Sequence, residues 1–494
     1  MKVESQSGED TRSPEMTMDW VTLQRPLPPK SEGMAWRDYL IMLLHIGAEL
    51  EHSLMVQYLY AAYSLNEQTG NSEQRRQVLE WRNRLLTVAK EEMGHLLTVQ
   101  NLLCLVGGPV CFERSHFPAD IDYLPFPLRL EPVSARLLAW YVYAEAPHDW
   151  QTLFRDHRRD PTGTFRDDIR MVAESVGDAP VTGHAHTVGQ LYDRIIEVLA
   201  DPLRIPDSAF RPDTYAQQAS WDEWGRGYRP PPARPGETEP PAESIAERGH
   251  VIVQRLGTRT EALAALRQIG KQGEAAHLGV ASDQEPSHFM RFVSLLDGFR
   301  KAAGERDMVF KAPVNPTTRG AAEQPAGTTR IEQQTSRLWA TLFNLRYRAL
   351  LAYLTHSFRL ARLVDAREPN VRGAVMHKVF GEMYNLKALA GILVRRPLRD
   401  GVPADAACAA PPFEMPYSMD LPTDEPDCWQ QHRDILISSL TICDTLLTKE
   451  DPLAPALTTD EANYLRALRQ LDQRSVAWID LIKGGLLRHG GHST

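Results

Sequence analysis

Apolar residues recur at helical spacing along most of the chain, and the alternation typical of strands is rare. Short strands fit only in 109–132 or 200–245. Gly107-Gly108-Pro109 and Pro147 mark helix ends, and Ser282-x-x-Glu285 fits a capping box. The pattern predicts helices over about 35–64, 76–106, 134–146, 187–199, 261–271 and 282–302, then over 331–364, 371–395, 427–448 and 459–484.

Breaks in the pattern divide this all-α chain. Residues 1–33 read as a flexible arm, and Gly, Pro and Thr make 306–330 a linker. We therefore expect a first helical domain over 34–305 and a second bundle over 331–494. A Pro-rich insertion at about 200–245 interrupts the first domain.

Composition narrows the functional classes. The 494-residue chain carries a net charge of −9, and it has no basic run for nucleic acid. Its five cysteines are dispersed without Cys-x-x-Cys, which favours reduced thiols in the cytoplasm. The polar, acidic start is unlike a signal peptide, and the most apolar windows are short for a bilayer. We expect a cytoplasmic protein with neither nucleic acid nor a membrane as partner.

Acidic and histidine residues on the predicted helices form a series: Glu, Glu-x-x-His, Glu, Glu-x-x-His. That series is the ligand formula of a carboxylate-bridged di-iron or di-manganese centre in a four-helix bundle. Carboxylate oxygens with a few imidazoles suit Fe(II) or Mn(II) and leave positions open for dioxygen. The candidate ligands are Glu51, Glu92, His95, Glu145, Glu285 and His288.

Glu-x-x-His occurs seven times, so the context of each pair must select among them. Glu92 and His95 share a face with leucines and valines, whereas Glu91 lies with Arg84 and Thr87 and reads as solvated. A buried carboxylate must be paired, protonated or bound to metal, which makes Glu92 informative.

The first and last helices leave alternatives open. Glu51 lies on the apolar side of its helix, but His45, Glu49 and His52 offer a rival set on a side that reads as exposed. Glu145 follows an apolar face and has a helix-end carboxylate as its simpler interpretation. Glu274, with His277, competes with Glu285, which could simply cap its own helix.

At these residues the chain resembles the ferritin-like domain of the iminophenyl-pyruvate dimer synthase type. The matching segments include ELEHSLMVQYLYAAYSL at 49–65, VAKEEMGHLLTVQNLLCLVGG at 88–108, WYVYAEAPH at 140–148, IGKQGEAAH at 269–277 and EPSHFMRF at 285–292. The resemblance covers about 36–300. It implies Glu51, Glu92, His95, Glu145 and His288 as ligands, with Glu285 sixth and Glu274 as an alternative or supporting residue. Gln190 departs from the family, which usually has Glu there.

The resemblance implies a ferritin-like bundle holding two iron ions, or manganese, and using dioxygen on a small amino-acid-derived substrate. Hydroxylation, desaturation and oxidative coupling all fit, and dimer-synthase-like coupling is the nearest alternative. A metal-free scaffold or an iron-handling protein are the others. Met55, Tyr58, Leu96 and Tyr141 are predicted pocket walls, since they lie about one helical turn from ligands. An external electron donor and a homodimer also fit this reading.

Overall fold

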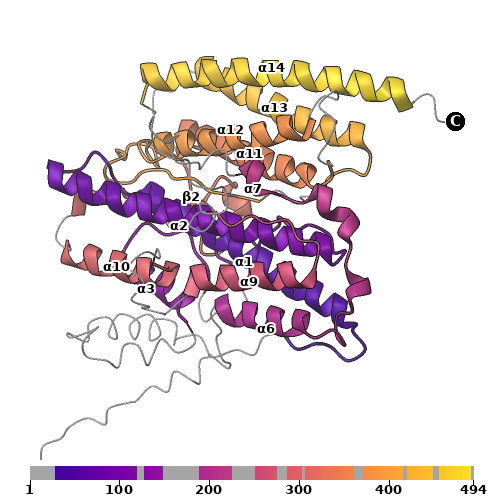
Figure 1. Cartoon of the computed structure of the whole chain (residues 1–494). Coiled ribbons are helices and arrows are strands. Elements are labelled where there is room, and N and C mark those ends of the chain that lie inside the picture. Colours follow the sequence, from indigo (N-terminus) through magenta and orange to yellow (C-terminus); the bar gives the residue numbers. More distant parts are fainter. Residues whose placement is uncertain are drawn as a thin grey trace, which may run out of the picture.

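The computed structural model describes residues 28–119, 127–147, 188–224, 251–274, 286–302, 306–360, 371–415, 420–448 and 455–490. Nearly all regular structure in these ranges is helical, as the hydrophobic pattern predicts. Figure 1 shows the helices stacked in layers, with the first two helices in the middle of the molecule. The predicted arm lies outside the described residues up to residue 27.

The central layer is a hairpin of two long helices, α1 (Trp36–Ser64) and α2 (Ser72–Leu105). α2 begins earlier than the apolar pattern indicates, because Asn71 and Gln74 form a reciprocal capping box. It ends as predicted, and Gly107 continues the chain at a positive φ of 68°. This hairpin supplies half of the predicted ligand set.

Four shorter helices cover one face of the hairpin: α3 (Ala135–Ala144), α6 (Val188–Ala200), α9 (Arg259–Glu274) and α10 (His288–Lys301). α3 packs on α10, and α6 packs on both α9 and α1 (Figure 1). The predicted start of the last helix at Ser282 is wrong. α10 begins at His288, and the Ser287 side chain caps it by accepting from the Met290 amide.

The described part of the insertion contains two 3₁₀ turns, η2 (Asp207–Ala209) and η3 (Pro212–Gln217), and a single helical turn, α7 (Trp221–Trp224). Residues 225–250, which include the Pro-rich stretch, lie outside the described residues. The chain then crosses α2 as an extended segment over 251–257. Gly94 allows this close approach, since a Cβ there would lie 2.8 Å from the Ile252 amide nitrogen.

The predicted linker is packed against the first helix rather than extended. It contains η5 (Arg306–Met308), η6 (Ala321–Glu323) and a parallel pair of short strands, β1 (Pro316–Thr317) and β2 (Thr329–Arg330). The Phe310 amide donates to the Ser64 carbonyl at 2.8 Å, and Asn315 is buried. In 109–132, an isolated bridge joins Ala119 to Leu128.

The second bundle consists of α11 (Gln334–Ser357), α12 (Val371–Leu393), α13 (Glu425–Thr448) and α14 (Thr459–Gly490). Buried Arg346 ties three of these helices together. It donates to Glu382 on α12 and, at 2.8 Å, to Asp472 on α14. Such a fully paired guanidinium fixes how the helices are arranged.

The two bundles share one continuous hydrophobic core. The side of α1 that carries His52, Ser53 and Gln57 is buried, although its polar residues read as exposed in the sequence. Tyr347 on α11 bonds His52 Nε2 at 2.5 Å, and Arg114 donates to the same hydroxyl at 3.2 Å. α1 is long and apolar enough to cross a membrane, but 67% of its most apolar window is buried in the protein, as in a core helix.

Candidate metal centre

Five of the six predicted ligands meet in the interior of the first bundle. All five are at most 2% exposed: Glu51, Glu92, His95, Glu145 and His288. They form two groups whose donor atoms lie within 4.8 Å of one another, Glu51–Glu92–His95 and Glu92–Glu145–His288. Glu92 belongs to both groups. This arrangement suits two cations that share the Glu92 carboxylate.

In each group the imidazole Nδ1 faces the carboxylates. His95 Nδ1 lies 3.0 Å from Glu92 Oε2 and 3.5 Å from Glu51 Oε2. His288 Nδ1 lies 2.8 Å from Glu92 Oε1 and 3.8 Å from Glu145 Oε2. The first distances are short for groups from different helices, so α2 and α10 are fixed closely at this level.

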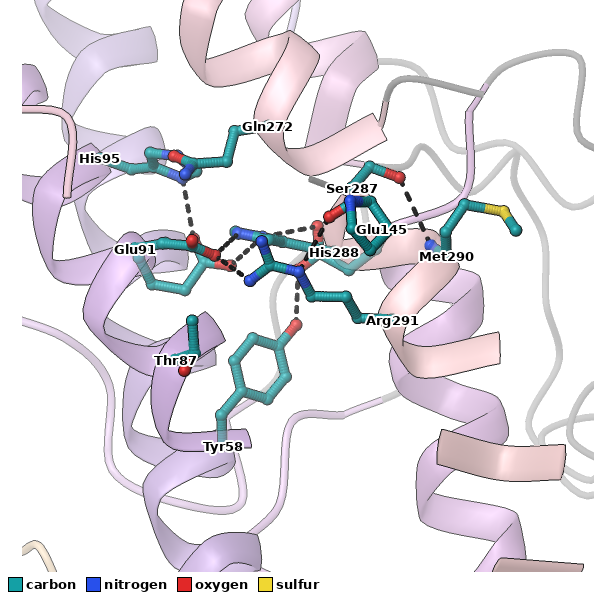
Figure 2. A network of polar contacts seen from close by, with 12 residues as sticks. Tyr58, Thr87, Glu91, His95, Glu145, Gln272, Ser287, His288, Met290 and Arg291 are labelled. Carbon is teal, nitrogen blue, oxygen red and sulfur yellow. Dashed lines mark hydrogen bonds and ion pairs between the residues drawn. The ribbon is translucent and has the colours of Figure 1, made fainter. Parts of the chain in front are cut away.

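The other nitrogen of each ring faces an acceptor. His95 Nε2 lies 2.9 Å from Gln272 Oε1, and His288 Nε2 lies 3.0 Å from Glu91 Oε2 (Figure 2). Both Nε2 atoms therefore carry the hydrogen, which leaves the Nδ1 lone pairs for a cation. Metal-binding histidines are commonly fixed in this way by a partner of the second nitrogen.

Glu91 is a functional residue that the sequence interpretation missed. It is 1% exposed, so its assignment to a solvated face is wrong. Figure 2 shows His288 and Arg291 reaching it from α10, and Arg291 Nη1 donates to Oε2 at 2.7 Å. The preceding polar residues, Arg84 and Thr87, are only partly buried, and α10 covers the helix one turn further on.

Two tyrosines hold the carboxylates of the outer ligands. Tyr58 donates to Glu145 Oε1 at 2.6 Å, and Tyr192 on α6 donates to Glu51 Oε1. Tyr141 packs against the Tyr58 ring at 4.6 Å between centroids. Leu96 is buried and Met55 is partly buried. The role of these residues as substrate-pocket walls stays a prediction, and Tyr58 has the additional task of orienting Glu145.

The sixth ligand stays a prediction. Glu285 lies outside the described residues, and it precedes α10, so the argument from one shared helix face does not apply to it. The side chain of Glu274 is also outside the description. Its neighbours reach the centre, however: Gln272 contacts His95, and a Cβ on Gly273 would lie 3.5 Å from Glu145 Oε2. The last turn of α9 therefore borders the site.

The rival set on the first helix has other partners. The Ser115 hydroxyl and amide donate to Glu49 Oε1 at 2.6 and 2.8 Å. His52 bonds Tyr347, as described above. In the described ranges, His45, Glu49 and His52 do not converge as a metal-binding group.

The electrostatics of the cluster follow from burying several acids together. Burial and the neighbouring Glu92 charge raise the pKa of Glu51 to about 8. Burial lowers the pKa of His95, but the charges of Glu92 and Glu51 outweigh it and raise that pKa to about 10. Without a cation, protons on these groups must therefore balance the buried charge.

The residues present fit a pair of hard divalent cations. Glu51 Oε2, Glu92 Oε1 and His288 Nδ1 are buried without a hydrogen-bond partner, and all three belong to the converging groups. Oxygen-rich donors with two imidazoles match iron or manganese, and no thiol is among them. The two groups together offer three carboxylates, which offset most of the charge of two divalent ions.

Comparison with known proteins defines the class. The profile of the ferritin-like family matches residues 44–297, just over half of the chain, and the chain belongs to that family. This assignment and the helical fold confirm the resemblance seen in the sequence.

The curated relatives are biosynthetic enzymes. The chain is 25% identical over 414 residues to dichlorochromopyrrolate synthase of Lentzea aerocolonigenes, covering 77% of this chain and 36% of that protein. It is 33% identical over 153 residues to 2-imino-3-(indol-3-yl)propanoate dimerase of Chromobacterium violaceum, covering 26% of this chain and 15% of that protein. The chain thus spans about a third or less of either relative. No solved structure matches it.

Proposed function

We propose that this protein is a metal-dependent oxidase that couples two molecules of an aromatic 2-imino acid in natural-product biosynthesis. One observation carries the proposal: Glu51, Glu92, His95, Glu145 and His288 converge in a chain related to an imino-acid dimerase. The relatives favour coupling over the hydroxylation and desaturation that the sequence also allowed. The metal we propose is a pair of iron ions, with dioxygen as co-substrate.

The proposed reaction balances with dioxygen alone. A 2-imino acid in its enamine form has an electron-rich carbon at position 3. Joining two such carbons forms one C–C bond and releases two protons and two electrons. Dioxygen takes up both and becomes hydrogen peroxide. The coupling therefore needs no external electron donor.

The protein's own residues have separable tasks in this proposal. Glu51 with His95, and Glu145 with His288, would hold one iron each, and Glu92 would hold both. The bound iron would transfer electrons from the substrate to dioxygen. Glu91 and Gln272 orient the imidazoles, while Tyr58 and Tyr192 orient the outer carboxylates. Burial of the whole cluster excludes water from the reacting groups.

The test is a product assay under defined redox conditions. The full-length protein is loaded anaerobically with Fe(II) and given the imine made from tryptophan or phenylalanine by an amino-acid oxidase with ammonium. We expect oxygen uptake on mixing with air and a dimer lighter than two monomers by two hydrogens. A monomer with one added oxygen would instead indicate hydroxylation, and a monomer that has lost two hydrogens would indicate desaturation.

Matched variants assign the activity to the centre. Glu92→Ala should abolish dimer formation, because it removes the residue common to both groups. Glu49→Gln is the control, since it lies on the same hairpin outside the centre and contacts Ser115. Equal dimer yield from Glu92→Ala and wild type would overturn the proposal.

A further inference from the structure

A second cluster of metal-ligand residues lies in the C-terminal bundle, apart from the centre described above. Glu425, Cys428 and His432 follow one another on α13 at spacings of three and four residues, so they share one helix face. His356, in the last turn of α11, faces them. The four residues combine oxygen, sulfur and nitrogen donors.

The donor atoms converge. Those of His356, Glu425 and Cys428 lie within 4.8 Å of one another. His356 Nε2 is 2.9 Å from Glu425 Oε1, and His356 Nδ1 is 2.9 Å from His432 Nε2. His432 therefore holds the His356 ring so that Nε2 points to the carboxylate and the sulfur. The Trp429 ring packs against His356 and further restricts its orientation, at 4.8 Å between centroids.

Burial and charge favour an anionic sulfur at this position. Cys428 and His356 are fully buried, while the Glu425 side chain is 35% exposed. Arg359 Nη1 lies 3.4 Å from Cys428 Sγ, and a guanidinium stabilises a thiolate over a thiol. Burial raises the pKa of Cys428, and Arg359 opposes that effect. The partly exposed side of Glu425 gives a cation a route from solvent.

We propose that His356 Nε2, the Glu425 carboxylate and Cys428 Sγ form a binding site for a thiophilic divalent cation such as Zn²⁺. Imidazole, carboxylate and thiolate are the ligands that zinc takes in proteins, and three of them leave a fourth position open. The thiolate and the carboxylate balance the charge of the ion. His432 accepts the Nδ1 hydrogen of His356 and acts as a positioning residue.

The competing interpretation is a structural chain of hydrogen bonds. In it, His432 would donate to His356, His356 to Glu425, and the Cys428 thiol to the Pro422 carbonyl at 3.0 Å. That chain gives no role to the contact between Arg359 and the sulfur. It also predicts no cation binding, so the two interpretations separate cleanly in an experiment.

Cobalt(II) is the probe, because a thiolate bound to it gives a charge-transfer absorption in the near ultraviolet. The full-length protein is stripped with a chelator, kept reduced and titrated with Co(II). We expect this absorption to saturate at one Co(II) per chain and to be bleached by Zn²⁺. The N-terminal centre cannot produce it, since its described ligands are oxygen and nitrogen atoms.

Cys428→Ser should abolish the absorption, whereas Cys443→Ser should retain it. Cys443 is the matched control, since it is equally buried on the same helix. Circular dichroism verifies that each variant is folded. If Cys428→Ser does not fold, Glu425→Gln decides, because its partly exposed side chain tolerates the change. It should weaken Co(II) binding roughly tenfold or more. Absence of the absorption in wild type, its survival in Cys428→Ser, or unchanged affinity in Glu425→Gln would overturn the site.

Discussion

At the scale of single residues, the candidate centre depends on side chains that are not themselves predicted ligands. Glu91 accepts from His288 and from Arg291, and both partners are buried with it. A carboxylate in that position fixes the hydrogen on His288 Nε2 and neutralises a guanidinium. Its removal should therefore affect stability and metal binding together.

Glu91→Ala should lower the free energy of unfolding by about 3–5 kcal/mol, because it leaves buried Arg291 without its partner. Denaturant unfolding monitored by circular dichroism measures the change. Glu80→Ala is the control. It removes the half-exposed partner of Arg84, so we expect a loss below about 1 kcal/mol. Equal losses for the two variants would contradict the buried pairing.

Metal loading should release protons. In the stripped protein the raised pKa of His95, about 10, keeps that imidazole protonated at neutral pH, and Nδ1 must lose its proton to bind a cation. Iron affinity should therefore rise with pH between about 6 and 8. A pH indicator in weakly buffered solution, followed during anaerobic Fe(II) addition, measures the release. Loading without proton release would contradict the proposed ligand role of His95.

Residue patterns predicted the ligands that lie on apolar faces and missed those that support them. Glu51 and Glu92 stand out as carboxylates among leucines and valines, and the structure brings them together. Glu91 follows a polar run, and only the packing of α10 shows that its face is buried. Gln272 has no pattern of its own. The IGKQGEAAH segment that contains it was the available signal.

At the scale of elements, the extended segment over 251–257 braces the ligand helix. The Ile252 carbonyl accepts from Thr98, and the Gln254 carbonyl accepts from Asn101, both on α2. Gly94, adjacent to His95, allows the backbones to approach. This contact is tertiary, so local periodicity could not predict it.

Gly94→Ala should destabilise the protein by about 1–3 kcal/mol, because the new methyl group would overlap the Ile252 backbone. Thermal unfolding measures the effect. Gly270→Ala on α9 is the control, since no atom lies within 4 Å of its Cβ position. That variant should be neutral or more stable by about 0.5–1 kcal/mol. A neutral Gly94→Ala would show that the segment can move away.

Helix positions were predictable from periodicity, and helix starts were predictable only where the capping residues were recognised. Thr458 and Glu461 cap α14 as the capping-box pattern predicts. The corresponding match at Ser282 misplaced α10, because Ser287, five residues later, provides the cap. Short motifs of this kind recur by chance, and the packing of His288 decides which one is used.

At the scale of the whole molecule, the hairpin of α1 and α2 is covered on both faces, by the short helices on one side and the second bundle on the other (Figure 1). The predicted division into two domains conflicts with no single contact. Nevertheless, the shared core and the packed 306–330 segment tie the halves together. The sequence could not show this, because polar His52 and Gln57 mark the buried interface.

We therefore expect the two bundles to unfold in one calorimetric transition, with a calorimetric enthalpy close to the van't Hoff value. Arg114→Ala should lower the midpoint of that transition, because Arg114 bonds both Tyr347 and the Phe413 carbonyl across the interface. Two well-separated transitions in the wild type would contradict a shared core.

The most direct test of the central claim is iron stoichiometry combined with Mössbauer spectroscopy. The full-length protein is stripped, loaded anaerobically with ⁵⁷Fe(II), freed of excess metal and then exposed to air. We predict about two irons per chain and a spin-coupled diferric spectrum, because two Glu/His groups share Glu92. Glu92→Ala should lose both. Protein that retains no iron, or a Glu92→Ala variant that binds as much as wild type, would contradict the account.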